Sequence, residues 1–263
     1  MNLPSILNIE LTNKCNKTCY MCGRRKVETQ NPNIKYTDEI DLKLLKKIAK
    51  QLPEGILIQF HNNGEPLLYS YLKEALSLFK KQIRCFDTNG KLLLEKYNEI
   101  IDNVETITIS TFEKDPEWEQ QYEILKEFLR KKGEKKPSVI IRCLGDIEKE
   151  RIEKYKELNC LMAYRILHSP MGSFEYKKQT VIPEHGICLE MLFHPAINVK
   201  GELSTCVRFD PDKKAVLGNL NKDSFKKIWN SNERRKWLQL HINGERNKIP
   251  LCSKCEFYGI PRG

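Results

Sequence analysis

The chain contains no long hydrophobic run. None of its apolar stretches approaches the roughly 20 residues that a transmembrane helix needs, although 40% of its 263 residues are apolar. The N-terminus, Met1-Asn2-Leu3-Pro4, also lacks the charged segment and the following apolar segment of a secretory signal peptide. We therefore expect a cytoplasmic protein that does not enter a membrane and that has enough apolar residues to bury a core.

Features typical of nucleic-acid binding are absent as well. The formal net charge is +10, but Lys and Arg are spread along the chain and alternate with Glu, instead of forming basic runs interleaved with aromatic residues. We interpret most of them as solvated helix faces and do not expect nucleic acid as a partner. The positive charge is compatible with an anionic small-molecule substrate.

Repeats and low-complexity tracts are absent apart from an alternation of strands and helices. Short segments rich in β-branched or apolar residues predict strands at 7–11, 56–60, 84–88, 106–110, 139–143 and 163–167. Between them apolar residues recur at helical spacing. Six such units imply a parallel sheet with right-handed crossovers, fewer than the eight units of a closed barrel. The predicted class is therefore α/β, with a partial (β/α)6 barrel over residues 1–170.

The pattern changes after this region, and we expect a small α+β domain over residues 171–263. A connecting loop over 169–183 is followed by a hairpin signal over 196–206, with Lys200-Gly201 as its turn. One helix is expected over about 224–240, with Ser224 as its N-cap.

Ten cysteines are many for a reducing compartment, where clustered cysteines usually bind metal or take part in catalysis. Seven of them fall into two spaced groups. The other three, Cys85, Cys143 and Cys160, lie in apolar segments, and we interpret them as small buried hydrophobic residues.

The first group, Cys15, Cys19 and Cys22, has the spacing C-x3-C-x2-C and follows the first expected strand. A [4Fe–4S] cluster normally takes four cysteines, so three thiolates leave one iron open to a ligand that is not protein. The alternative is structural zinc, which needs four ligands, and no further His or Cys lies nearby in the sequence to complete such a site.

The second group, Cys188, Cys206, Cys252 and Cys255, has the spacing C-x17-C-x45-C-x2-C. Four thiolates can close a zinc site or a [4Fe–4S] cluster. Composition alone slightly favours zinc at this point.

These motifs resemble the radical S-adenosylmethionine (SAM) enzymes, whose C-x3-C-x2-C signature follows the first strand of a partial barrel. A Gly-Gly-Glu-Pro-like motif after the second strand holds the SAM amino group in that family. Here the segment is Asn63-Gly64-Glu65-Pro66, with Asn63 in place of the first glycine. An ordinary turn would also use Gly and Pro here, and a structural salt bridge would equally account for Arg142. The resemblance assigns SAM contacts to Met21, Gly64, Glu65, Pro66, Asn89, Ser110 and Arg142.

The second group resembles, in its order of elements, the auxiliary-cluster domain of the same family. The full form is called SPASM and binds two clusters, and the truncated form, called twitch, binds one [4Fe–4S] cluster. The chain has eight residues after Cys255, which resembles the twitch form. The resemblance therefore implies two [4Fe–4S] clusters and SAM as cofactors, with the fully ligated auxiliary cluster moving electrons.

The function implied by this resemblance is hydrogen abstraction from a substrate by a 5′-deoxyadenosyl radical. The cysteine layout is most similar to family members that oxidise an aminocyclitol alcohol, so we expect a dehydrogenase of a sugar- or cyclitol-like alcohol. Arg165 and His168, after the sixth strand, are the candidates that help take the hydroxyl proton. Modification of a peptide and a non-enzymatic iron–sulfur or zinc module are the alternatives. We also expect a monomer that takes electrons from a donor such as flavodoxin or ferredoxin.

Overall fold

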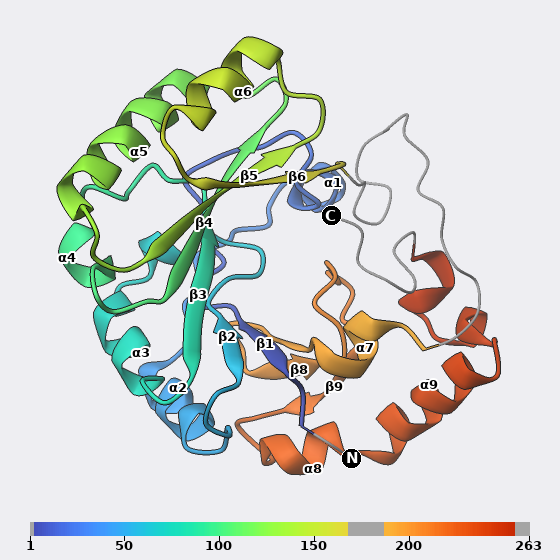
Figure 1. The fold of residues 1–263 in the computed structure, drawn as a ribbon. Coiled ribbons are helices and arrows are strands. Elements are labelled where there is room, and N and C mark those ends of the chain that lie inside the picture. The colour runs from blue at the N-terminus through green and yellow to red at the C-terminus, as the bar shows by residue number, and fades with distance from the viewer. Residues whose placement is uncertain (1–2, 168–186, 256–263) are drawn as a thin grey trace.

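One curved sheet organises the residues that this computed structural model describes, 3–167 and 187–255 (Figure 1). The strand order is β6-β5-β4-β3-β2-β1-β7-β8-β9. The first six strands are mutually parallel, each beside the next in the sequence. They are β1 (Ile6–Ile9), β2 (Leu57–Gln59), β3 (Ile83–Thr88), β4 (Thr106–Phe112), β5 (Ser138–Leu144) and β6 (Leu161–Arg165). This linear order confirms the predicted α/β class and the partial barrel.

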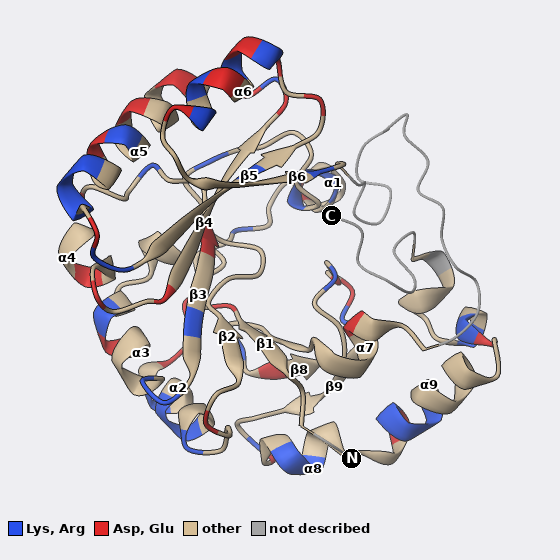
Figure 2. Cartoon of the chain, in the orientation of Figure 1, with Lys and Arg blue, Asp and Glu red and all other residues tan. Residues whose placement is uncertain are grey.

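Helices follow the strands and lie along the outer, convex side of the sheet (Figure 1). They are α2 (Leu42–Ala49), α3 (Leu72–Leu78), α4 (Tyr97–Ile100), α5 (Trp118–Lys132) and α6 (Lys149–Lys156). Their exposed faces carry mixed Lys, Arg, Asp and Glu (Figure 2), as expected for solvated helix faces. A further helix, α1 (Arg24–Gln30), directly follows the first cysteine group and was not predicted.

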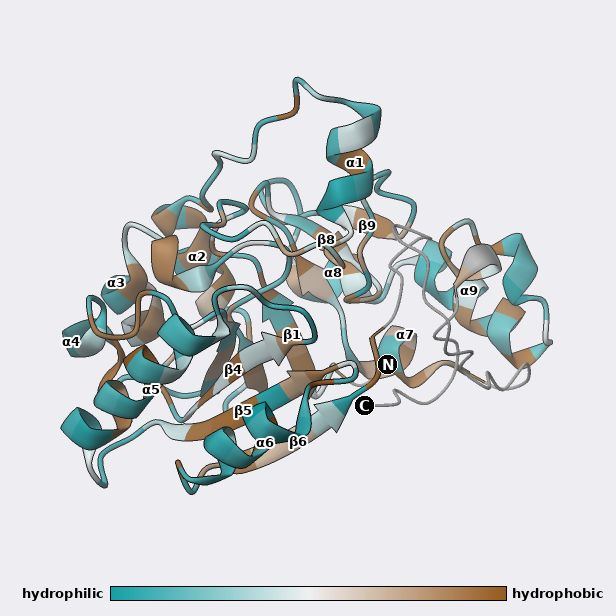
Figure 3. Ribbon diagram, turned by 90° about the horizontal axis from the view of Figure 1, so that it is seen from above, coloured by the Kyte–Doolittle hydropathy of each residue, from teal (hydrophilic) through white to brown (hydrophobic). Residues whose placement is uncertain are grey.

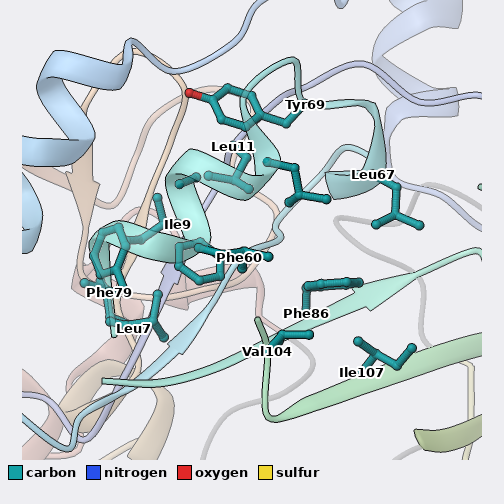
Figure 4. Packing of buried hydrophobic residues seen from close by; sticks show 14 of the residues in the cluster. Leu7, Ile9, Leu11, Phe60, Leu67, Tyr69, Phe79, Phe86, Val104 and Ile107 are labelled. Carbon is teal, nitrogen blue, oxygen red and sulfur yellow. The ribbon is translucent and has the colours of Figure 1, made fainter. Parts of the chain in front are cut away.

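The core lies between the strands and these outer helices, where brown apolar segments face one another (Figure 3). Leu7 and Ile9 of β1 pack with Phe60 and Phe79, all fully buried (Figure 4). The rings of Phe60 and Phe79 meet edge to face, with centroids 5.1 Å apart, an arrangement that adds to the free energy of burial. This packing fixes the strand ends from which the functional loops extend.

The three isolated cysteines only partly match their interpretation as buried hydrophobic residues. Cys143 of β5 is 1% exposed and belongs to the core, whereas Cys85 and Cys160 are half-buried.

The C-terminal elements continue the same sheet. β7 (Ala196–Ile197) pairs in parallel with β1, with Ala196 opposite Asn8. β8 (Glu202–Ser204) runs antiparallel to β7, which confirms the predicted hairpin, and Gly201 in its turn has a φ of +76°. β9 (Val216–Asn219), which was not predicted, completes the sheet. Backbone hydrogen bonds between β7 and β1 thus join the C-terminal region to the barrel. The predicted domain boundary between residues 170 and 171 lies outside the described residues.

The prediction of a single helix over 224–240 is wrong, because two helices occupy this region. They are α8 (Phe225–Trp229) and α9 (Asn232–Ile242). Ser224 caps α8 as predicted, and Ser231 caps α9 by accepting a hydrogen bond from the Arg234 N–H. A second capping serine therefore starts a new helix where hydrophobic periodicity alone indicated continuation.

Short elements complete the described chain: α7 (Leu189–Phe193) and the 3-10 turns Pro66–Leu68, Arg246–Lys248 and Cys252–Lys254. Across the described residues, no helix combines the length and apolar character that a membrane crossing requires.

Candidate functional site

The first cysteine group lies in a loop that leaves the carboxyl end of β1 and enters α1. The Cys22 N–H donates to the Cys19 carbonyl at 3.1 Å, and the Arg25 N–H donates to the Cys22 carbonyl at 2.9 Å. These turns direct the loop around one space at the strand ends, where parallel α/β folds place their ligands.

Gly64 brings the loop after β2 against the cysteine loop. A Cβ at position 64 would lie 2.0 Å from the Thr12 carbonyl oxygen, and the neighbouring Glu65 N–H donates to the Lys14 carbonyl at 2.8 Å. Only glycine allows this approach. The neighbouring Asn63 is held in place because its N–H and its side-chain amide both donate to the buried Glu10 carboxylate.

A cavity of about 420 Å³ extends from the first cysteine group to the second. All seven cysteines of the two groups line it. Of the predicted SAM contacts, six line the cavity as well: Met21, Gly64, Glu65, Asn89, Ser110 and Arg142. Pro66 is buried at the start of a 3-10 turn and is not among the lining residues. The topology thus brings residues from the carboxyl ends of all six parallel strands and from the C-terminal region to one space.

All ten cysteines are free thiols. Among residues 3–167 and 187–255, no three His, Cys, Asp or Glu side chains are arranged as ligands of a single metal ion. Burial raises the pKa of the Cys19 thiol to about 12, although Lys17 opposes this shift. Burial also raises the pKa of Cys252 to about 12 and that of Cys206 well above its usual value. Burial therefore favours the protonated thiols, and iron would have to displace these protons and compensate the charge of the thiolates.

Glu65 is the buried carboxylate of the cavity, at 2% exposure. It accepts hydrogen bonds from the Thr88 hydroxyl at 2.7 Å, the Asn89 N–H at 2.8 Å and the Leu67 N–H at 3.1 Å. Burial nevertheless raises its pKa to about 7. A carboxylate has about four acceptor positions, so three donors leave room for one more. A bound ammonium group would supply both that donor and the missing positive charge.

Arg142 is committed to a partner inside the protein. Its guanidinium contacts the Asp87 carboxylate, and His61 Nε2 lies 3.6 Å from the same oxygen. Burial raises the pKa of Asp87, but His61 and Arg142 outweigh it and the net shift is downward. The salt-bridge interpretation of Arg142 is therefore what the structure shows, and a SAM carboxylate would have to share the guanidinium with Asp87.

Asn89 and Ser110 lie at the carboxyl ends of β3 and β4. The Asn89 side chain donates to Asn16 Oδ1 at 2.8 Å, which ties the third strand end to the cysteine loop. The backbone carbonyls of Asn89 and Ser110 both accept from the Gln121 amide, at 2.6 and 3.0 Å. Gln121 of α5 therefore fixes the two strand ends relative to each other.

Three cysteines of the second group, Cys188, Cys206 and Cys252, lie in a small apolar core of the C-terminal region, with Met191, Trp237, Ile249 and Leu251. Cys255 is half-buried. Arg246 Nη1 donates to the carbonyls of Cys252 and Cys255, at 3.2 and 3.1 Å, and so shapes the C-x2-C turn. The Arg208 N–H points to the Cys206 sulfur at 3.5 Å. Hydrogen bonds of this kind to sulfur tune the reduction potential of a cluster.

Of the two residues predicted to help take the hydroxyl proton, the structure describes only Arg165. Arg165 ends β6 and is exposed, and it is not among the residues that line the cavity. Although the residue as a whole is exposed, partial burial of its guanidinium and the nearby Arg142 lower its pKa. His168 lies outside the described residues.

The sequence motifs do not identify four polar residues that line the cavity: His61, Asp87, Glu190 and Arg208. Glu190 Oε2 lies 2.9 Å from His194 Nδ1, and Glu190 Oε1 lies 3.8 Å from Arg208. Asp87 is the last residue but one of β3, and His61 lies two residues after β2. Their position near the carboxyl ends of strands was therefore an available signal in the sequence. Glu190 lies in the short helix α7, and its approach to Arg208 comes from the tertiary structure.

Comparison with known proteins agrees with this geometry. Residues 188–256 match the SPASM family, an iron–sulfur cluster-binding domain. No curated protein sequence matches the chain. Among solved structures, BtrN in complex with AdoMet and 2-DOIA is 20% identical, with a TM-score of 0.63 over 97% of this chain and 93% of BtrN.

Two further structures are similar. Native anSMEcpe with bound AdoMet is 15% identical, with a TM-score of 0.70 over 95% of this chain and 88% of its own. Streptococcus suis SuiB bound to S-adenosylmethionine is 13% identical, with a TM-score of 0.68 over 97% and 72%. These matches confirm the resemblance inferred from the cysteine motifs. The described chain therefore shares its fold with these structures, which were solved with SAM bound, and its residues 188–256 match the SPASM iron–sulfur cluster-binding domain.

Proposed function

We propose that the protein is a radical SAM dehydrogenase that oxidises an alcohol of a sugar- or cyclitol-like small molecule. The observation that carries the proposal is the single cavity lined by all seven clustered cysteines and by the buried Glu65. When bound, a [4Fe–4S] cluster with one open iron supplies the electron that splits SAM into methionine and the hydrogen-abstracting radical.

The residues of the first group fit the cofactors that this function requires. Cys15, Cys19 and Cys22 are free thiols on one loop and supply three ligands. Glu65 would supply an acceptor for the SAM ammonium, and burial raises its pKa to about 7, so a bound cation would stabilise its carboxylate form. Met21 and Ser110 line the same cavity and are the residues proposed to contact the adenosine part of SAM.

The second group fits an electron acceptor. Cys188, Cys206, Cys252 and Cys255 offer four thiols to one centre, which would leave no open iron. Both groups line the same cavity, so a substrate between them would lie within reach of both. This arrangement supports a two-electron oxidation, in which one electron leaves with the abstracted hydrogen atom and the other passes to the auxiliary site.

The barrel residues would hold the substrate and manage its proton. His61 and Asp87 of the barrel, with Glu190 of α7, present polar groups to the cavity, while Phe112 and Leu144 supply an apolar wall. Arg165 and His168 remain our candidates for helping the hydroxyl proton leave. Similarity to BtrN, which was solved with 2-DOIA, supports a polyhydroxylated substrate, and a donor such as flavodoxin or ferredoxin would supply the first electron.

The test is anaerobic reconstitution with iron and sulfide, followed by SAM and dithionite. We expect 5′-deoxyadenosine from the parent protein and none from Cys19→Ala. Iron should be about eight per chain and about four in Cys252→Ala/Cys255→Ala. An intact first cluster that forms no 5′-deoxyadenosine with any polyol tried would refute the radical function, and zinc at the second group would refute its electron-accepting role.

A further inference from the structure

Lys17 is a buried cation inside the first cysteine loop, between Cys15 and Cys19. It is 8% exposed and lines the cavity. Its ammonium lies 2.6 Å from Asp115 Oδ2, at 3.8 Å from Glu117, and 4.9 Å from the centre of the Phe112 ring. Asp115 is itself 2% exposed. The loop therefore places a fully desolvated charge pair beside its own thiols.

Folding stability alone gives little reason for such a pair. The cost of desolvating two charges often cancels their attraction, and apolar residues of similar volume can replace a buried ion pair without loss. The net charge of an iron–sulfur centre with three thiolates is negative, by contrast, and such a centre gains from a nearby cation. Lys17 supplies such a buried cation from between the first two cysteines.

Two more side chains of the same loop are bound to the barrel. Asn16 accepts a hydrogen bond from the Asn89 side chain at 2.8 Å, and the Tyr20 hydroxyl donates to Glu113 Oε1 at 2.8 Å. Together with Lys17 and Asp115, these contacts attach the residues between the cysteines to the segments that follow β3 and β4. The loop is thus held by its non-cysteine residues.

We propose that the Lys17–Asp115 pair is a positioning pair that fixes the first cysteine loop and sets the reduction potential of the cluster bound there. The proposal rests on the proposed function, because it requires a cluster on Cys15, Cys19 and Cys22. Lys17 stabilises the more negative, reduced state of the cluster, and Asp115 opposes it while holding the ammonium in place. The two members of one ion pair therefore act on the potential with opposite signs.

The experiment is a spectroelectrochemical titration of the first cluster. All variants are made in the Cys252→Ala/Cys255→Ala protein, so that one cluster reports, and each is first shown to hold about four iron atoms per chain. Lys17→Met should shift the midpoint potential to a more negative value, and Asp115→Asn should shift it to a more positive value. Lys17→Arg keeps the charge and should restore the parent value, and Lys17→Met/Asp115→Asn should fall between the single variants.

Lys14→Met is the matched control. Lys14 also lies in this loop, one residue before Cys15, and pairs with Glu39 at 2.7 Å, but its side chain is 38% exposed. Solvent screens such a charge, so the potential should stay at the parent value. Iron release to a chelator gives a second measurement, and Lys17→Met should weaken iron retention by about tenfold or more.

The outcomes separate this inference from the proposed function. If the parent protein takes up no iron on the first group, the proposed function fails. If the parent cluster forms but Lys17→Met leaves its potential unchanged, the inference is overturned and the function stands. Shifts of the same sign in Lys17→Met and Asp115→Asn would also overturn it, because general loosening of the loop acts in one direction.

Discussion

The binding of SAM should depend on the ionisation of Glu65. Burial raises the pKa of this carboxyl to about 7, and three donors already occupy most of its acceptor positions. Only the carboxylate form can pair with the ammonium of SAM, which stays mostly protonated below pH 7. Binding must therefore select the ionised fraction of the free protein, so affinity should rise with pH up to about 7.

The magnitude follows from the ionised fraction. With a pKa of about 7, roughly half of the protein carries the carboxylate at pH 7.0 and roughly 9% carries it at pH 6.0. The dissociation constant for SAM should therefore rise about five- to sixfold when the pH falls from 7.0 to 6.0. Glu65→Gln removes the charge, and losing a charge-assisted hydrogen bond of about 1.5–3 kcal/mol weakens binding roughly 10- to 150-fold.

The assay is anaerobic equilibrium dialysis of labelled SAM against the cluster-loaded protein at pH 6.0, 6.5 and 7.0. Glu65→Gln should bind weakly at every pH and show no slope. Glu39→Gln is the matched control, since Glu39 pairs with Lys14 outside the cavity, and it should keep the parent slope. Thermal unfolding checks that each variant is folded. A parent affinity that is flat across this range, or a Glu65→Gln protein that keeps the slope, would refute the reasoning.

Three other predictions concern the scaffold. Gly64→Ala places a Cβ against the Thr12 carbonyl, and the forced backbone shift should cost about 1–3 kcal/mol of unfolding free energy in urea denaturation; unchanged stability would show that the loops can separate. Phe60→Ala should lower the free energy of unfolding by about 3–5 kcal/mol in the same assay. Ile83→Ala is the control and should lower it much less, because Ile83 is 47% exposed. Equal losses in the two variants would contradict the assigned core. Arg246→Met removes the donor to the carbonyls of the Cys252–Cys255 turn. The iron content per chain should therefore fall from about eight atoms to about four. Full retention of iron would show that the turn forms without Arg246.

Most of the parallel sheet could be predicted because its strands are short apolar runs separated by helical periodicity. The errors lie where local signals compete. The strand expected at 163–167 begins two residues earlier, at Leu161, and apolar residues on both sides of it gave no clear boundary. The helix expected over 224–240 is divided because Ser231 is a capping residue within an apolar pattern that would otherwise continue.

The sequence predicted those residues of the candidate site that belong to short motifs. Cysteine spacing and Gly64-Glu65 identified ligands because these residues are close in sequence as well as in space. The pairing of Arg142 with Asp87 joins residues 55 positions apart, and a strand pattern does not specify which partner a buried cation finds. Lys17 was overlooked because its partner Asp115 lies 98 positions away, so one sequence showed only a lysine in a loop.

The pairing of β7 with β1 has a consequence for how the chain can be divided. Without β7, the N–H and C=O groups on the outer side of β1 would form an unpaired sheet edge, which readily pairs with another chain. A barrel expressed without residues 187–255 should therefore aggregate through β1, even if its own core is complete. By pairing β7 with β1, the C-terminal domain covers the open edge of the barrel sheet and prevents it from pairing with other chains.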